Sequence, residues 1–471
     1  MRTMFIQPNY PSVVKKVLGE AAHPLGFGYL ASVLRERNEV KIVDALGLDY
    51  NPDEVTSKIK KFDPEVIGVT ATTPSIYKAY DVARIAKDIN PDIKTIIGGP
   101  HVTFTAKETL KECEHLDIVV RGEGEETVRE LSDAFEKEGD LKSVLGITFR
   151  EDGKIAETGD RPLIKNLDEI PFPAYDLLPE LKFDDKKYAV MMTSRGCPFN
   201  CIFCSSSLLC GKVWRGRSPE NVVEEMSILK SRGIDEIEFL DDTFTLNRKR
   251  VEKICDLIKR EKLDVSWSCS SRVNTINREM AEKMKSVGCH TVYMGVESGT
   301  ERILKIISKG ITLKEAEKAV KMVKEVGLNS VCSFVLGIPG ETIETMKKTI
   351  NFAKKLNPTF AQFTLATPYP GTRLFEIAKE KGSLLTKDWS RYTTLDPVMK
   401  IPGIAAKELK SMLTKAYIKF YFTPRKILEQ LKDGRFSIIK KAFSAAYKYV
   451  RSQGHEEFKH EESGLTNNEY Q

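Results

Sequence analysis

The sequence predicts an α/β protein with an N-terminal parallel-sheet domain, a partial (β/α)6 barrel and a C-terminal helical region. Short runs rich in Val and Ile alternate with amphipathic segments, which is typical of βαβ units. This alternation stops near residue 140 and resumes at Tyr188. Six strand-like runs then follow within 188–375, which suits an open barrel better than a closed eightfold one.

The first domain is expected over 1–140, with helices at 25–37 and 76–89. Ligands on parallel sheets bind at the carboxyl ends of the strands. Those ends fall at 8–10, 70–73, 98–101 and 122–125, and glycine in two of them would let a ligand approach the backbone. Tight turns without a ligand are the alternative. The expected strands are 3–7, 40–45, 66–73, 94–100 and 116–125.

A linker is expected over 141–187. The stretch REDGKIAETGDR predicts a hairpin that turns at Asp152-Gly153. The proline-rich IPFPAYDLLP that follows predicts an extended segment that packs against its neighbours.

The barrel is expected over 188–375 and a helical region over 376–454. The last segment, 455–471, is polar and lacks periodicity, so it is predicted to be disordered. The expected barrel strands are 188–196, 236–244, 264–273, 291–299, 329–340 and 360–370.

Composition narrows the class of protein. The chain has 471 residues, 30% charged and 41% hydrophobic, which is ordinary for a soluble protein. The net charge of +6 is small for this length and gives no reason to expect a nucleic-acid partner. No run of 18 apolar residues and no signal peptide is found. We expect a cytoplasmic protein, in which clustered cysteines bind metal rather than each other.

Three of the nine cysteines lie in TSRGCPFNCIFCSSS, at positions 197, 201 and 204, directly after the first barrel strand. Barrel enzymes place their active sites on the loops after strands. Thiolates are the usual ligands of iron–sulfur clusters, and three of them hold three irons of a four-iron cluster. The fourth iron would stay open for chemistry. Three buried thiols without metal, or a zinc site completed elsewhere, are the alternatives.

CPFNCIFC, with Phe203 before the last cysteine, resembles the cluster motif of the radical S-adenosylmethionine (radical SAM) superfamily. The later motifs FLDDTF, SSR, GVESG and LGIPGET come in the order that this superfamily uses, so the resemblance covers roughly 188–375. It implies a 4Fe-4S cluster on Cys197, Cys201 and Cys204, with S-adenosylmethionine chelating the fourth iron.

The resemblance also assigns the contacts with S-adenosylmethionine. Phe203 would lie near the adenine, Arg272 would face the carboxylate, and Glu297 would accept from the ribose hydroxyls. Salt bridges at the barrel mouth are the alternative for the charged residues. The rest of this site would be lined by Asp241, Asp242, Gly337 and Gly340.

The turns TATTPS, GGPH and GEGE, with the connector RPLIKNLDEIPFPAYDLL, resemble the Rossmann-like cobalamin-binding domain of one radical SAM subfamily. The chain departs from cobalamin proteins in general because it has no Asp-x-His-x-x-Gly motif. The resemblance therefore implies methylcobalamin with no histidine ligand to cobalt. The predicted cobalamin contacts are Pro8, Asn9, Thr72, Thr73, Gly98, Gly99, His101, Gly122, Glu123 and Gly124.

The activity that the resemblance implies is C-methylation of an unactivated carbon through a deoxyadenosyl radical and methylcobalamin. A ring-forming enzyme with the same cofactors, as in anaerobic porphyrin ring closure, is the alternative. A methylthiotransferase would need a second cysteine triad, and only Cys113 precedes Cys197. A cobalamin carrier or sensor would not need the cysteine motif. The expected partners are a ferredoxin- or flavodoxin-type electron donor and a small-molecule, lipid or peptide substrate.

Two further features have ordinary interpretations. The cysteines at 113, 210, 255, 269, 289 and 332 form no second motif, and we expect them to be small buried hydrophobes, least certainly so at 210. The segment 425–452 mixes basic and apolar residues. A helix packed on the barrel with a solvated basic face is favoured there over contact with a membrane surface.

Overall fold

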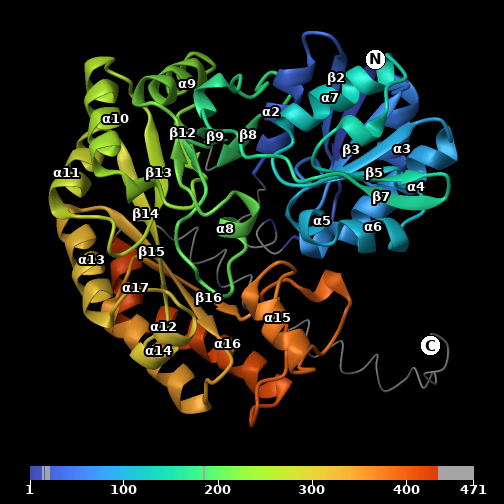
Figure 1. The fold of residues 1–471 in the computed structure, drawn as a ribbon. Helices are drawn as coiled ribbons and strands as arrows, with labels where there is room; N and C mark the ends of the chain where they lie inside the picture. The colour runs from blue at the N-terminus through green and yellow to red at the C-terminus, as the bar shows by residue number, and fades with distance from the viewer. Residues whose placement is uncertain (13–14, 16–21, 184–185, 433–471) are drawn as a thin grey trace.

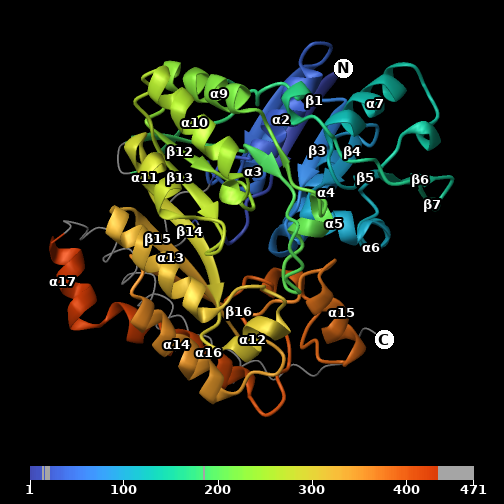
Figure 2. The ribbon, with the colours of Figure 1, turned by 60° about the vertical axis from the view of Figure 1, so that its left-hand side comes forward.

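The computed structural model describes residues 1–12, 15, 22–183 and 186–432. Two seven-stranded sheets organise the chain, one in the N-terminal domain and one in the barrel (Figure 1). Helices cover both faces of the first sheet and the outer face of the second (Figures 1 and 2).

The N-terminal sheet has the strand order β2-β1-β3-β4-β5-β6-β7, and its first five strands are parallel, as predicted. The order reverses between β1 and β3, the point where ligands bind in open sheets of this kind. The strands are β1 (Arg2–Gln7), β2 (Glu39–Asp44), β3 (Val66–Thr70), β4 (Lys94–Gly98), β5 (Ile118–Val120), β6 (Ile147–Glu151) and β7 (Lys154–Glu157).

Alternate residues of β1 fill the cores on the two faces of this sheet. Met4 and Ile6 are fully buried on one face, whereas Phe5 stacks on Phe27 of α2 on the other, with ring centroids 4.9 Å apart. The helices of the domain are α2 (Leu25–Leu34), α3 (Pro52–Phe62), α4 (Ile76–Ile89), α5 (Pro100–Phe104), α6 (Ala106–Glu112) and α7 (Glu125–Glu136).

The predicted hairpin is present as β6 and β7. Asp152 (φ 48°) and Gly153 (φ 75°) both have positive φ, as a tight two-residue turn requires. The hairpin is not a separate linker element, because β6 pairs antiparallel with β5. The first sheet therefore continues past residue 140 to Glu157.

The barrel sheet has the order β16-β15-β14-β13-β12-β9-β8, and it is curved (Figure 2). Six strands are parallel and follow one another in chain order, which confirms the predicted open barrel, while β8 pairs antiparallel at the edge. The strands are β8 (Leu181–Phe183), β9 (Lys186–Met191), β12 (Glu236–Phe239), β13 (Ser266–Ser271), β14 (Cys289–Glu297), β15 (Asn329–Leu336) and β16 (Phe360–Leu365).

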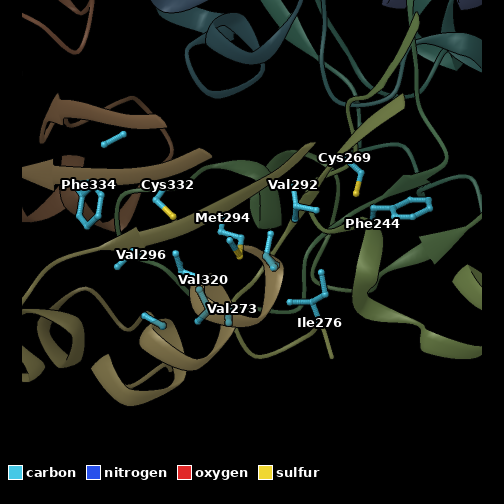
Figure 3. Close-up of a cluster of buried hydrophobic side chains, with 14 of the residues drawn as sticks. Phe244, Cys269, Val273, Ile276, Val292, Met294, Val296, Val320, Cys332 and Phe334 are labelled. Atoms are coloured by element: carbon cyan, nitrogen blue, oxygen red, sulfur yellow. The ribbon is translucent and has the colours of Figure 1, made fainter. Parts of the chain in front are cut away.

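The barrel core fills the space between this sheet and its outer helices. Phe244, Met294 and Phe334 are among the side chains that meet there (Figure 3). Five of the six other cysteines are buried as predicted, whereas Cys210 is only partly buried. The outer helices are α9 (Pro219–Ser231), α10 (Arg248–Arg260), α11 (Arg278–Ser286), α12 (Glu301–Ile306), α13 (Leu313–Val326) and α14 (Ile343–Leu356).

The C-terminal region is helical, as expected, with α15 (Arg373–Glu380), α16 (Ala406–Tyr421) and α17 (Pro424–Lys432). Tyr417 and Tyr421 of α16 donate hydroxyl hydrogen bonds of 2.9 Å to carbonyls of the edge strand β16. The predicted disordered tail and most of the basic segment 425–452 lie outside the described residues. Among the helices described, each is too short or too polar to cross a membrane.

Candidate functional site

The cysteine loop, residues 196–213, joins two short strands at the mouth of the barrel. These strands, β10 (Ser194–Arg195) and β11 (Arg215–Gly216), pair antiparallel and close the loop at its base. Gly196 has φ 88°, and a Cβ there would lie 2.5 Å from the carbonyl oxygen of Val213. Only glycine fits at this position. The loop therefore begins with a close backbone contact that fixes where its cysteines start.

The three cysteines fit an iron–sulfur cluster. Cys197, Cys201 and Cys204 are free thiols, each partly buried. Burial raises the pKa of Cys197 and Cys204, so both stay protonated until a metal displaces the proton. In the part of the chain that the structure describes, no group of His, Cys, Asp or Glu is arranged around a single metal ion. A four-iron cluster does not need that arrangement, because each thiolate binds a different iron.

Arg272 follows β13 and lies beside the cysteine loop. Its guanidinium carbon is 3.5 Å from the ring centroid of Phe199, and its Nη1 is 3.8 Å from the sulfur of Cys201. The side chain is buried, and its Nε has no hydrogen-bond partner among the described residues. A buried donor without a partner is costly, so this position suits an anionic ligand.

Asp241 and Asp242 follow β12 but have different surroundings. Asp241 is buried and accepts hydrogen bonds from the backbone of Thr193 (2.6 Å) and from the hydroxyls of Thr193 and Ser194 (both 2.5 Å). It fixes the segment that leads into the cysteine loop, and it forms no salt bridge with any described residue. Asp242 is exposed at the surface. Even so, desolvation of its carboxyl by the surrounding protein raises its pKa, and this outweighs the lowering effect of a hydrogen bond from Ser206.

Glu297 ends β14 and is buried. Its Oε1 lies 2.7 Å from the ammonium of Lys309, and both side chains are less than a tenth exposed. Its Oε2 has a long contact of 3.4 Å with the hydroxyl of Ser333. The alternative interpretation, a salt bridge at the barrel mouth, therefore describes one of its oxygens and leaves the other open to a ligand.

The turn after β15 carries the predicted glycines. Gly337 (φ 81°) and Gly340 (φ 92°) both adopt the left-handed conformation. Glu341 accepts hydrogen bonds from the backbone of Gly337 (2.7 Å) and Ile338 (3.0 Å), and burial raises its pKa to about 7. Phe203 is partly buried against the barrel core. Both glycines therefore lie in a turn whose backbone conformation is fixed by hydrogen bonds to Glu341.

The predicted cobalamin contacts all follow the strands at one edge of the first sheet. Pro8 is buried after β1, and Asn9 donates to the carbonyl of Tyr50 at 3.2 Å. Thr72 is exposed after β3. Gly122 follows β5, and no atom lies within 4 Å of a Cβ built there, so its surroundings are open. The other predicted contacts at these strand ends are Thr73, Gly98, Gly99, His101, Glu123 and Gly124.

His101 is buried at the start of α5. Its Nδ1 is 3.2 Å from the hydroxyl of Thr73, and its ring meets Trp389 edge-on at 5.1 Å. Burial lowers its pKa to about 4. These contacts fix one side of the ring, and the absence of a histidine ligand to cobalt stays a prediction.

Glu123 does not simply line the sheet edge. It accepts hydrogen bonds from Arg195 (3.1 Å) and Arg215 (2.8 Å), which flank the cysteine loop, and from the backbone of Ile164 (2.8 Å). Arg195 also pairs with Glu125 at the start of α7. The strand end after β5 is thereby joined to the base of the cysteine loop through buried ion pairs.

Sequence reasoning missed several of these partners. Arg195 stands two residues before Cys197, which was a usable signal. Lys309 and Trp389 gave none, because only the fold brings them to Glu297 and His101.

Two family models match the chain. The model of the radical SAM superfamily covers residues 191–353, and the model of the B12-binding domain covers 11–132. The uncharacterized methyltransferase PH0819 of Pyrococcus horikoshii is 52% identical over 445 residues, which are 94% of this chain and 97% of that protein. The chain belongs to the cobalamin-dependent radical SAM family. The cofactors of the family are a 4Fe-4S cluster, S-adenosylmethionine and cobalamin.

Other members of this family differ in activity. The anaerobic magnesium-protoporphyrin IX monomethyl ester cyclase of Rubrivivax gelatinosus is 34% identical over 438 residues, 89% of this chain and 77% of the cyclase. Among solved structures, the cobalamin-dependent radical enzyme OxsB matches with a TM-score of 0.73 at 17% identity, over 94% of this chain and 72% of OxsB. The methyltransferase TsrM of Kitasatospora setae matches with 0.70 at 18%, over 90% and 89%. At these identities the two structures show the shared fold.

Proposed function

We propose that this radical SAM protein is a methyltransferase that acts on an unactivated carbon of its substrate. The observation that carries the proposal is the 52% identity with the Pyrococcus horikoshii methyltransferase along 94% of the chain. A match over 445 of the 471 residues extends into both domains.

Each cofactor region has its own set of residues in this proposal. Cys197, Cys201 and Cys204 would hold the cluster, and the barrel residues predicted for S-adenosylmethionine would surround its open iron. Residues 1–140 would hold cobalamin at the strand ends. When bound, these groups supply one-electron cleavage of S-adenosylmethionine and a methyl group for transfer.

The link through Glu123 supports methyl transfer between the two regions. Because Glu123 follows β5 and binds Arg195, two residues from Cys197, the cobalamin edge lies next to the cysteine loop. A carbon radical is short-lived, so its methyl donor must already be in place. Buried ion pairs at this point hold the two regions at a fixed separation.

The test is the stoichiometry of turnover with S-adenosylmethionine labelled in its methyl group. Methylation should consume two S-adenosylmethionines per product and give one deoxyadenosine and one S-adenosylhomocysteine. The label should appear on the product, which mass spectrometry of anaerobic reactions with candidate extracts would detect. These ratios do not depend on knowing the substrate beforehand.

The cyclase relative, 34% identical, favours a second candidate, a ring-forming reaction without methyl transfer. Such an enzyme would form deoxyadenosine with its product but no S-adenosylhomocysteine, and it would transfer no label. That outcome would reject the methyltransferase proposal.

Partners and location follow from the same chemistry. Reductive cleavage needs an external electron, for which a ferredoxin- or flavodoxin-type protein in the cytoplasm is proposed, and the substrate would be a small molecule, lipid or peptide. Exposed Ile418, Ile427 and Leu428 on α16 and α17 leave contact with a membrane surface as a further proposal. Cosedimentation with anionic vesicles would test it, and recovery of all the protein in the supernatant would reject it.

A further inference from the structure

The ion pair of Glu297 and Lys309 depends on an irregular backbone at the end of β14. The register of β14 against β15 shifts between Gly295 and Glu297, and such irregularities re-aim side chains next to active sites. Glu297 itself has φ 69°, a left-handed conformation that is uncommon outside glycine. Residues held in such sparsely populated conformations cluster at functional sites.

Gly295 provides the space for this pair. A Cβ at position 295 would overlap both Oε1 of Glu297 and Nζ of Lys309. The carboxylate and the ammonium therefore lie directly against the bare backbone of the strand. A general surface salt bridge would need no such gap, so the site is shaped around these two groups.

Lys309 also belongs to the loop that holds the rest of the site. Residues 307–310 are the first part of this loop, which joins α12 to α13 over 307–312. The backbone carbonyl of Lys309 accepts a hydrogen bond from Nη2 of Arg272, and the carbonyl of Ile307 accepts one from the amide of Ile202 in the cysteine loop at 3.1 Å. Residues 307–310 thus contact the cysteine loop, the buried arginine and the buried glutamate.

The ion pair with Lys309 engages only one of the two carboxylate oxygens of Glu297 closely. Lys309 occupies Oε1 at 2.7 Å, whereas Oε2 has only the 3.4 Å contact with Ser333. An ionised carboxylate has about four lone-pair sites, so several acceptors remain for ligand hydroxyls. Without the ammonium, the buried carboxylate would lose the ion pair that fixes the position of Oε1.

We propose that Lys309 is a positioning residue for S-adenosylmethionine. It holds Oε1 of Glu297 in the buried ion pair, so that Oε2 is positioned to accept hydrogen bonds from the ribose hydroxyls. This inference rests on the assignment of Glu297 to the ribose and deepens the proposed function. It concerns binding alone, so it can fail while the methyltransferase proposal stands, and the reverse also holds.

The experiment compares two ligands with the cluster-reconstituted protein by anaerobic calorimetry. One is S-adenosylmethionine, and the other is its 2′-deoxyribose analogue, which lacks one hydroxyl. A hydrogen bond to a charged group contributes about 1.5–3 kcal/mol, so the natural protein should prefer S-adenosylmethionine by about 10- to 100-fold. Lys309→Met should reduce this preference to about threefold or less, and Lys309→Arg should keep most of it.

The matched control is Lys305→Met, which changes an exposed lysine on α12 and should leave the preference unchanged. Glu297→Gln and the double variant Glu297→Gln/Lys309→Met complete a cycle. The double variant contains neither buried charge, so it remains a folded comparison even where Lys309→Met alone loses its cluster or its structure. Iron content and thermal unfolding identify that case.

The expected result of the cycle is that the double variant shows the same low preference as Glu297→Gln. Equal losses for both ligands in Lys309→Met, with the preference intact, would reduce Lys309 to a structural role and overturn the proposal. A further fall in preference from Glu297→Gln to the double variant would also overturn it, because Lys309 would then act independently of Glu297. So would a natural protein that does not distinguish the two ligands.

Discussion

Replacing Glu123 by Gln should destabilise the contact between the two domains by several kcal/mol. The Glu123 side chain is 7% exposed, and its carboxylate binds Arg195 and Arg215, which are 9% and 8% exposed. Glutamine keeps the shape but not the charge. Among the described residues, Arg195 would retain Glu125, whereas Arg215 would have no carboxylate partner. Removing one partner of a buried ion pair costs about 3–5 kcal/mol. This is a large part of a typical free energy of unfolding, which is about 5–15 kcal/mol.

The assay is urea unfolding followed by tryptophan fluorescence, in which the free energy falls linearly with denaturant. Glu126→Gln is the control, because Glu126 pairs with Arg129 at the surface, where both side chains are more than 40% exposed. Exposed pairs contribute about 0–1 kcal/mol. Equal midpoints for Glu123→Gln and Glu126→Gln would refute the reasoning.

The same prediction has a pH dependence with a definite sign. Burial acts to raise the pKa of Glu123. The hydrogen bond from Arg215 and the charge of Arg195 act in the opposite direction and together outweigh burial, so the net pKa is depressed. A depressed carboxyl pKa stabilises the fold fully above the unfolded value of about 4.3, and this is lost as the pH falls through the folded value. Glu123→Gln should lack this acid-side loss.

The remaining predictions concern the two cofactors. Replacing Cys197, Cys201 and Cys204 by Ala should abolish both bound iron and deoxyadenosine formation, and a triple variant that still cleaved S-adenosylmethionine reductively would show that the cluster lies elsewhere. The resonance of cobalt(II) cobalamin in the protein should carry no axial splitting from His101, because the chain lacks the Asp-x-His-x-x-Gly motif of cobalt-ligating histidines. Nitrogen splitting that disappears in His101→Ala would contradict this.

Local patterns were sufficient for the parallel strands of both sheets, because each is a short apolar run, but not for the short antiparallel strands β8, β10 and β11. The hairpin at Asp152-Gly153 was also predictable, since its turn chemistry is local. Its pairing with β5 was not, because nothing local specifies a distant strand. The strand expected over 236–244 ends at Phe239, since Asp241 turns inward to bind Thr193.

The candidate site divides in the same way. The cysteines, Arg272 and Glu297 stand in motifs that can be read in order along the chain. Their partners cannot, because the sequence contains 73 lysines and arginines and no local rule selects Lys309 for Glu297. A buried carboxylate does predict that some cation pairs with it. Only the fold decides which one.

The cysteine loop is held from three directions, and this links the order of the loop to the docking of the domains. Asp241 binds the segment before it, the 307–310 loop binds Ile202 within it, and Glu123 binds Arg195 and Arg215 at its two ends. The first two supports belong to the barrel, but the third comes from the cobalamin-binding domain. Loss of Glu123 would therefore loosen the loop as well as the interface, although it contacts no cysteine. Under the proposed function, the domain that would supply the methyl donor also helps to fix the loop that would hold the cluster.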